Sequence, residues 1–342
     1  MNQKIFDNNW LVESGDEKDV VLISRIRLAR NLKNHHFPNK ASIVEKEEII
    51  EQLQNNLSFL ESENFHFFKM EEFSSLERDV LQEKNLISKC HSENIEGKAL
   101  ILNNKLHLST MINEEDHLRI QVFGSGLDFS TIWQVADQFD DQIESEVEYA
   151  FSNKWGYLTS CPTNVGTALR ASVMCHLPAL VLSERINEVL GAVGKFGLTV
   201  RGVSGEGSGS AGELFQISNQ ITLGYTEKEI IDNLKSIILQ IIREERRSRL
   251  YLVNKNYDKL KDNVLRSLGI LKYAHRLKEN EALNFLSKVK FGLDSGLIEE
   301  DINKNIFSEL IFKIRTAHLQ LNNYNSQEEL DIKRAELIRN SL

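Results

Sequence analysis

Cysteine is scarce in this 342-residue sequence, which contains only Cys90, Cys161 and Cys175. An odd, sparse set of this kind indicates that no disulfide framework holds the fold, and it favours a reducing cytoplasm as the location. Two of the three stand directly before a histidine, as Cys90-His91 and Cys175-His176. No CxxC or HxxxH spacing accompanies them, so we expect no metal held by protein side chains.

Long apolar runs are also missing. No segment approaches the roughly 20 consecutive apolar residues that a membrane-spanning helix requires. The N-terminal stretch MNQKIFDNNWLVESGDEKD has no apolar core flanked by positive charge, so we expect no signal peptide. The sequence therefore predicts no association with a membrane.

An excess of positive charge is absent too. The formal net charge is −9, whereas a general nucleic-acid-binding protein normally carries a basic excess. We therefore expect no direct contact with nucleic acid, although a local cluster of arginines is still compatible with this total. The apolar fraction of 41% and the charged fraction of 27% are typical of a globular chain long enough for one large domain or two ordinary ones.

The first two-thirds of the chain mixes strand and helix patterns. ISRIRLAR (Ile23–Arg30) alternates as a half-buried strand, with Arg25 and Arg27 on one face. ALILNNKLHLS (99–109) predicts a hairpin around Asn103-Asn104, and INEEDHLRI (112–120) should continue the sheet. LTVRGV and ELFQIS are further strand candidates, joined by a glycine-rich loop.

Helical patterns intervene and then take over. We expect one helix from Ser130 to Val147, one capped by Ser183, and a long one that begins with a Thr226–Glu229 capping box. After about Lys255 the strand signals vanish and four or so helical patterns follow. The sequence thus predicts an α+β domain over residues 1–250 and a smaller all-helical domain over 255–342.

The stretch GSGSAG (207–212) satisfies the GxGxxG pattern. A dinucleotide site requires strand, loop and helix, with an acid about 20 residues further on. Here the loop separates two strand candidates, which is closer to the glycine flap of a eukaryotic-type protein kinase. The HRD and DFG elements of those kinases are absent, as is GxxxxGK[ST]. We interpret the stretch as a turn that can close over a ligand.

Five arginines lie in or beside apolar, strand-like segments, where a charge is costly without a partner. Each taken singly fits an ordinary surface or salt-bridged arginine. As a set they can hold a nucleotide triphosphate without a phosphate-binding loop, because guanidinium groups match phosphate oxygens two at a time and stay charged. These residues are Arg25, Arg27, Arg119, Arg170 and Arg201.

Several motifs together resemble a known family. CPTNVGT (161–167) and NEEDHLR (113–119), with SRIRLARN, LRASV and RG…GE in the same order, are similar to the signature of the ATP:guanidino phosphotransferases, which include creatine and arginine kinases. The similarity extends over essentially the whole chain and is strongest to the bacterial protein arginine kinases (McsB type). It implies an antiparallel sheet flanked by helices, then a small all-helical C-terminal domain for dimerisation and regulation.

The resemblance also implies roles for individual residues. Glu115 is expected to be the general base, four residues before Arg119, and Glu206 the second glutamate, five after Arg201. Cys161 occupies the position of the reactive cysteine whose thiolate contacts the guanidinium. Glu114 and Asp116 should alternate to the other strand face and play structural roles.

ATP and Mg²⁺ are the implied ligands, with magnesium bridging the β- and γ-phosphates and held mainly by nucleotide and water. Asn85 stands where the family usually has histidine, in EKNLIS instead of EKHLIS. The implied ATP-binding residues are Ser24, Arg25, Ile26, Arg27, Leu28, Asn85, Arg119, Arg170, Ala171, Ser172, Val173, Met174, Arg201, Gly202, Val203, Ser204 and Gly205.

The acceptor is expected to be an arginine exposed on a protein. Small-molecule members carry a helical domain before the catalytic one, and only about 20 residues precede VVLISRIR here. Two alternatives stay open: a kinase for free arginine or another small guanidino compound, and a catalytically weak adaptor that binds phosphoarginine.

The resemblance further implies a homodimer, an activator protein and a stress-response repressor as a substrate. It also implies an allosteric phosphoarginine pocket with the pattern RDxxRA. This chain has LDIKRA (330–335), which keeps Asp331 and Arg334 but replaces the first arginine with Leu330.

Overall fold

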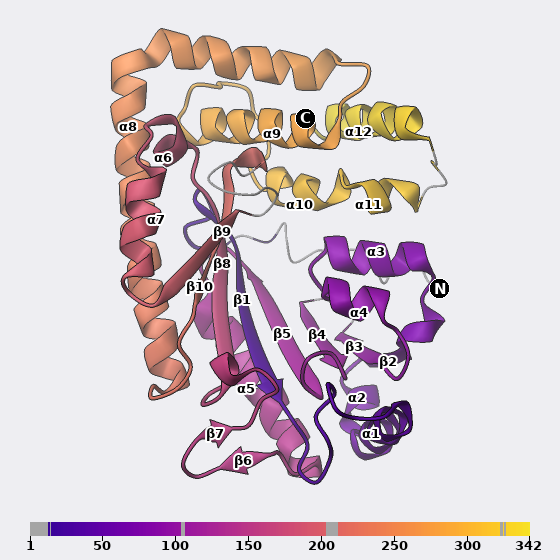
Figure 1. Cartoon of the computed structure of the whole chain (residues 1–342). Coiled ribbons are helices and arrows are strands. Elements are labelled where there is room, and N and C mark those ends of the chain that lie inside the picture. Colours follow the sequence, from indigo (N-terminus) through magenta and orange to yellow (C-terminus); the bar gives the residue numbers. More distant parts are fainter. Residues whose placement is uncertain (1–12, 14, 104–106, 203–210, 322–323, 325) are drawn as a thin grey trace.

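An eight-stranded antiparallel sheet forms the centre of the molecule in a computed structural model that describes residues 13, 15–103, 107–202, 211–321, 324 and 326–342 (Figure 1). The strand order is β2-β3-β4-β5-β1-β8-β10-β9, and every neighbouring pair is antiparallel. The strands are β1 (Val21–Arg30), β2 (Phe65–Lys69), β3 (Ala99–Asn103), β4 (Leu108–Ile112), β5 (Leu118–Ser125), β8 (Leu169–His176), β9 (Leu198–Gly202) and β10 (Leu214–Asn219). β6 (Phe151–Ser152) and β7 (Gly156–Tyr157) make a separate hairpin. This confirms the predicted fold class.

The alternation along β1 decides what each face of the sheet carries. Ile26 and Leu28 are buried in the core, while Arg25 and Arg27 emerge on the opposite face. Because β1 lies between β5 and β8, the register places Arg27 between Arg170 of β8 and Gln121 of β5. The central strand therefore brings polar groups of three strands onto one face.

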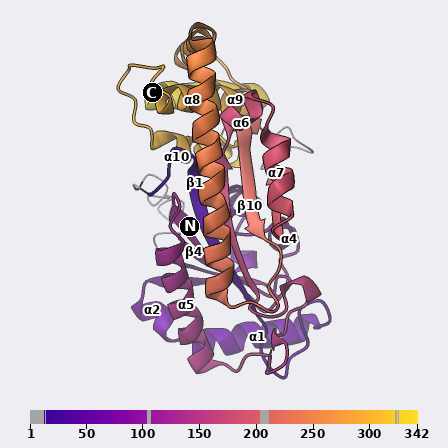
Figure 2. The same cartoon turned by 90° about the vertical axis from the view of Figure 1, so that its left-hand side faces the viewer.

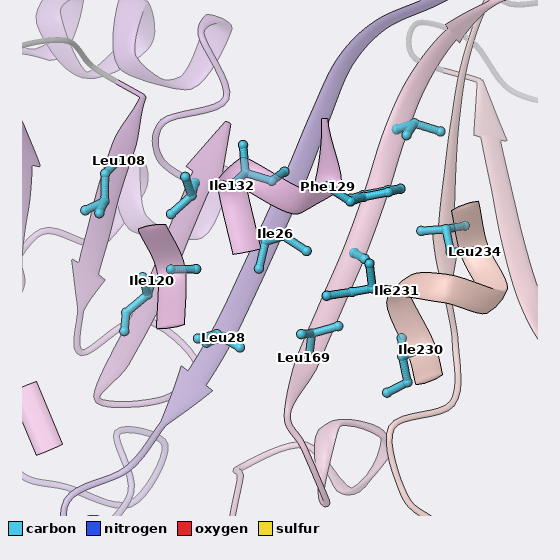
Figure 3. Packing of buried hydrophobic residues seen from close by; sticks show 14 of the residues in the cluster. Ile26, Leu28, Leu108, Ile120, Phe129, Ile132, Leu169, Ile230, Ile231 and Leu234 are labelled. Carbon is cyan, nitrogen blue, oxygen red and sulfur yellow. The ribbon is translucent and has the colours of Figure 1, made fainter. Parts of the chain in front are cut away.

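Two long helices cover the other face. α5 (Phe129–Glu146) contacts β1 and β5, and α8 (Glu227–Tyr273) contacts β8 and β10 (Figure 2). α8 begins with the predicted Thr226–Glu229 capping box, whereas α5 is capped by Asp128. Figure 3 shows the packing between these helices and the sheet, with Ile132 of α5 and Leu234 of α8 in one apolar cluster.

The C-terminal helices pack on the face that carries the arginines. α9 (Glu279–Asp294), α10 (Ile306–Lys313) and α12 (Gln327–Ser341) share a second apolar cluster with strand residues such as Ile23 and Phe123, and α11 (Thr316–Gln320) packs on α12. α3 (Ser75–Glu83) and α4 (Lys89–Glu93) lie over β2 to β5 on the same side (Figure 1). The other short elements are α1 (Ile43–Asn56), α2 (Phe59–Ser62), η3 (Met70–Glu72), η4 (Pro162–Asn164), α6 (Pro178–Leu182), α7 (Ile186–Gly194) and η5 (Ala211–Glu213).

Helix α8 crosses the predicted boundary between residues 250 and 255 without a break and departs from helical geometry at Asn256 (φ −134°, ψ 37°). The division into two domains therefore stays a prediction. None of the helices in the described ranges, α8 included, combines the length and apolar character that crossing a membrane requires.

Two local predictions are wrong. Ser183 does not cap α7; it ends α6, where its hydroxyl donates to the carbonyl oxygen of Ala179 (2.7 Å). INEEDHLRI does not continue the sheet throughout, because residues 113–117 form a bend between β4 and β5. Asn113 starts that bend with a left-handed backbone (φ 57°), which asparagine tolerates better than most residues.

The predicted hairpin of β3 and β4 is confirmed, with Asn103 as the last residue of its first strand.

Replacing Leu234 with alanine should lower the free energy of unfolding by about 2–5 kcal/mol, because this fully buried side chain joins α8 to the sheet core. Urea denaturation measures the change. Lys235→Ala, at an exposed position of the same turn, should stay within about 0.5 kcal/mol of the wild type. Equal losses in both variants would contradict the assignment of α8 as a core element.

Candidate functional site

The five predicted arginines converge on one region of the sheet face. Burial first, then the charges of Arg119 and Arg170, lowers the pKa of Arg25 to about 9. Burial and the neighbouring arginines hold the pKa of Arg27 well below its ordinary value, and burial followed by Arg201 and Arg119 lowers that of Arg170. Guanidinium groups remain charged at any relevant pH. These pKa shifts therefore reflect positive charge that is both buried and crowded, a cost that a bound anion would relieve.

Little negative charge balances this cluster. Within the described residues, Glu114 is the carboxylate that forms an ion pair with a member, at 2.6 Å from Arg119. Arg25 Nε donates to the Ser172 hydroxyl (3.4 Å), and Arg170 Nε donates to the Asn219 carbonyl oxygen (3.3 Å). Arg27 Nε is buried and finds no hydrogen-bond partner in the described part of the chain. Buried cations without partners are costly, so the arrangement favours a polyanionic ligand.

Two cavities adjoin the cluster and share Arg25 and Asn85. One, of about 170 Å³, is lined by more apolar than polar surface. Its lining residues are Ile23, Arg25, Lys84, Asn85, Phe123, Ser172, Val173, Met174, Arg201, Gly202, Gln216 and Phe312. The other, of about 280 Å³, is lined by Arg27 and Arg119 among others. An apolar compartment next to a cationic one suits a flat ring that carries phosphate groups.

The bend between β4 and β5 directs its three adjacent acids to different partners. Glu114 accepts hydrogen bonds from the Ser88 hydroxyl and from Arg119, both at 2.6 Å. Burial by itself would raise the pKa of Glu114, but Arg119, Ser88 and the Glu115 amide outweigh it and hold the pKa at about 2. Asp116 accepts from the Ser160 amide (2.7 Å) and from the Asn31 side chain (2.6 Å). The first and third acids are therefore occupied by contacts within the protein.

Glu115 is exposed, and Cys161 lies close enough to influence its pKa. Burial of its inner part raises the pKa of Glu115, and Asp116 and Glu114 add to this effect, while Arg119 and Cys161 oppose it. The tie from Asp116 to the Ser160 amide holds the Cys161 segment beside the acid bend. The structure thus pairs a carboxylate of raised proton affinity with a thiol at the edge of the arginine cluster.

The glycine of CPTNVGT explains part of that motif. Gly166 has φ +114°, and a Cβ there would lie 2.5 Å from the Thr222 carbonyl oxygen. The Thr222 hydroxyl in turn donates to the carbonyl oxygens of Thr163 (3.1 Å) and Val165 (2.8 Å). The motif therefore folds as a tight loop against the segment after β10, and this loop presents Cys161.

Some predicted ATP-binding side chains point away from the cluster. Ile26, Leu28 and Ala171 lie in the core on the opposite face, and the Ser24 hydroxyl donates to the Gly126 carbonyl oxygen (2.6 Å). Ser172, Val173, Met174, Arg201 and Gly202 line the smaller cavity. Val203, Ser204, Gly205 and Glu206 lie outside the described residues, so their predicted roles stay predictions.

Asp331 and Arg334, the two residues predicted to belong to a phosphoarginine pocket, form an ion pair on α12. Asp331 lines a cavity formed mainly by α9. Arg334 is fully buried, where it donates to the carbonyl oxygens of Ile314 (2.7 Å) and Leu277 (2.8 Å) and to Asp331 (2.6 Å). These contacts engage the guanidinium group inside the helical region, and the role of Arg334 in a phosphoarginine pocket stays a prediction.

Five lining residues of the smaller cavity escaped the sequence prediction. Ile23 is two residues before Arg25 on the same strand, and Phe123 and Gln216 stand opposite Arg25 and Arg201 in the sheet register, so strand alternation could have suggested them. Lys84 is the neighbour of Asn85. Phe312 comes from α10, and no local pattern connects it with the strands.

Two models of known protein families match this chain. Residues 46–248 match the model of the ATP:guanido phosphotransferase C-terminal catalytic domain, and residues 257–342 match that of the protein-arginine kinase McsB C-terminal domain. The chain belongs to the ATP:guanido phosphotransferase family.

Similar relatives are the protein-arginine kinases of Halothermothrix orenii and Desulforamulus reducens. The first is 50% identical over 337 residues and the second 44% over 345 residues, with 98% of this chain and 96% or 95% of the relative covered. The solved structure of a lombricine kinase has a similar fold, with a TM-score of 0.60, 23% identity and 70% of each chain covered.

The Arg27→Met variant should be more stable without ligand than the wild type, by about 1–3 kcal/mol, because it removes a crowded charge and an unpartnered buried donor. It should also bind inorganic triphosphate about tenfold more weakly. Urea denaturation and titration calorimetry measure the two effects.

Arg78→Met is the matched control, because the guanidinium of Arg78 donates to the Ser92 and Phe73 carbonyl oxygens and carries no such stress. This control should lose stability and keep its triphosphate affinity. A loss of stability in Arg27→Met as large as in the control would contradict the proposed electrostatic stress.

Proposed function

We propose that this chain transfers the γ-phosphoryl group of ATP to arginine side chains of proteins. The observation that carries the proposal is the position of Glu115 and Cys161 beside the cluster of five arginines. Membership of the phosphotransferase family supports the reaction class. The name shared by the full-length relatives, protein-arginine kinase, supports the acceptor.

Glu115 is the proposed general base. A guanidinium group is a poor nucleophile because it is protonated and its lone pairs are delocalised. Glu115 accepts a proton from the attacking nitrogen, which forms a bond to the γ-phosphorus while the bond from that phosphorus to the β–γ bridging oxygen breaks and ADP leaves. A raised pKa makes this carboxylate a better proton acceptor. Cys161 contacts the same guanidinium group, and Glu206 is expected to assist from the opposite side.

The arginines hold the phosphate groups and neutralise their charge, which is most of what phosphoryl transfer requires from a protein. The described residues include no group of three or more His, Cys, Asp or Glu side chains placed to hold a metal ion. We therefore expect the Mg²⁺ ion to arrive with ATP, held by phosphate oxygens and water instead of by side chains of the protein. When bound, the ion supplies further neutralisation of the β- and γ-phosphates.

The acceptor side of the site is open. Glu115, Pro162 and Thr163 are exposed, so an arginine carried on a protein surface can reach the carboxylate.

Purified chain should be incubated with labelled ATP and either an unfolded protein or free arginine. Acid-labile label on the protein supports the proposal. Label on free arginine alone favours the small-molecule kinase, and tight phosphoarginine binding without any transfer favours the adaptor.

The remaining expectations are a homodimer formed through the C-terminal helices, an activator protein and a stress-response repressor among the substrates, all of which rest on the family resemblance alone. The expected cytoplasmic location rests on the scarcity of cysteine. Assaying the purified chain without additions tests the need for an activator directly.

Glu115→Gln should retain ATP binding and lose phosphoryl transfer by about two orders of magnitude or more, because glutamine keeps the shape of the side chain but cannot accept the proton. Single-turnover transfer to an unfolded protein measures the rate, and calorimetry measures ATP binding. Transfer at a near wild-type rate would remove Glu115 from the role of base.

The acid limb of the kcat/KM profile should lie above pH 4.5, the ordinary pKa of a glutamate, because the pKa of Glu115 is raised. Activity is lost as the pH falls through that value and Glu115 becomes protonated. Asp116→Asn keeps an acceptor oxygen for Ser160 and Asn31 but removes one charge that raises the pKa. The acid limb of the kcat/KM profile of this variant should therefore move to lower pH. Initial rates of ADP formation measure both profiles, and an unmoved limb would contradict this coupling.

A further inference from the structure

The corner between α10 and α11 contacts the catalytic part of the chain. Phe312, near the end of α10, is 6% exposed and lines the smaller cavity together with Phe123 and Met174 of the sheet. α11 packs on α3, at the right-hand side of the sheet in Figure 1. A helical region distant in sequence therefore forms part of the cavity that also contains Arg25 and Arg201.

Glu83, the last residue of α3, fastens this corner. Its two carboxylate oxygens accept hydrogen bonds from the amides of Ala317 (2.8 Å) and His318 (3.1 Å) and contact His318 Nδ1 (2.7 Å). Glu279 of α9 completes the arrangement by accepting from the Thr316 amide (3.2 Å). The start of α11 is thus held by one carboxylate from the catalytic sheet side and one from the helical region.

The residues after Glu83 enter the same cavity. Asn85 has a left-handed backbone (φ 60°), and the Leu86 amide donates back to the Leu81 carbonyl oxygen (2.9 Å). This turn is typical of a helix C-terminus and places Lys84 and Asn85 on the cavity wall. A movement of α11 that pulled on Glu83 would therefore act on the wall within two residues.

We propose that Phe312 is a residue of the nucleotide site that contacts the base. We further propose that Glu83 is a positioning residue that holds Phe312 and Asn85 in place on the wall of the smaller cavity. The proposal rests on the proposed function, which places a nucleotide at the arginine cluster. It assigns part of the nucleotide affinity to the C-terminal helical region.

The chemistry of the cavity fits a heteroaromatic ring. Phe312, Phe123 and Met174 offer apolar and aromatic surface, while Asn85 and Gln216 can hydrogen-bond to the edge of a ring. Arg25 and Arg201, which also line the cavity, belong to the arginine cluster that is proposed to hold the phosphates. A phosphate chain without a base would occupy only the cationic part of the site and would not contact Phe312.

The test compares ATP with inorganic triphosphate on the full chain by calorimetry. Phe312→Ala should weaken ATP binding about tenfold, as expected for the loss of one stacking contact, and leave triphosphate binding unchanged. Phe312→Leu, which retains more of the apolar volume, should show a smaller loss. Glu83→Ala should weaken ATP in the same selective way and raise the KM for ATP more than it lowers kcat.

Phe307→Leu is the matched control, because Phe307 is also buried on α10 but lines a different cavity. It should bind both ligands like the wild type even where its stability is lower. ATP affinity unchanged in Phe312→Ala, while triphosphate still binds, would overturn this inference and leave the proposed function intact. Failure of the wild type to bind either ligand would overturn both.

Discussion

Crowding of positive charge on one face of the sheet is the constraint on which the rest of the site depends. Burial, together with the charges of neighbouring guanidinium groups, depresses the pKa of Arg25, Arg27 and Arg170, and Glu114 is the carboxylate paired with the cluster in the described part of the chain. Such an arrangement costs stability in the free protein. The large core between the sheet and the helices α5 and α8 compensates for it, and bound phosphate groups would turn the same charges into favourable contacts.

The bend between β4 and β5 lets the adjacent acids Glu114, Glu115 and Asp116 contact different partners and serve different roles. Glu114 steadies Arg119, and Asp116 ties the bend to the segment that carries Cys161. Glu115, between them, keeps an exposed carboxylate and a raised pKa. A regular strand would have placed the two outer acids together on one face, where they would repel each other. The irregular backbone, which begins at Asn113, instead directs the three carboxylates toward different neighbours.

The C-terminal helices are part of the site as well as a region beside it. They share an apolar cluster with strand residues, and their α10–α11 corner is bonded to the end of α3. A shift of these helices would therefore move residues that line the smaller cavity. This arrangement gives a physical route by which contacts made by the helical region can influence the catalytic face, without a separate relay of side chains.

The sequence by itself determined the antiparallel α+β class, the orientation of Arg25 and Arg27 on one strand face and the start of α8, because alternation and capping are local patterns. It also singled out the arginines and Glu115. Only the tertiary structure decided that Arg334 is buried, that the three acids lie in a bend and that Phe312 reaches the cavity. The reason is physical: strand register, loop closure and helix docking join residues far apart in the chain, and no local pattern encodes those contacts.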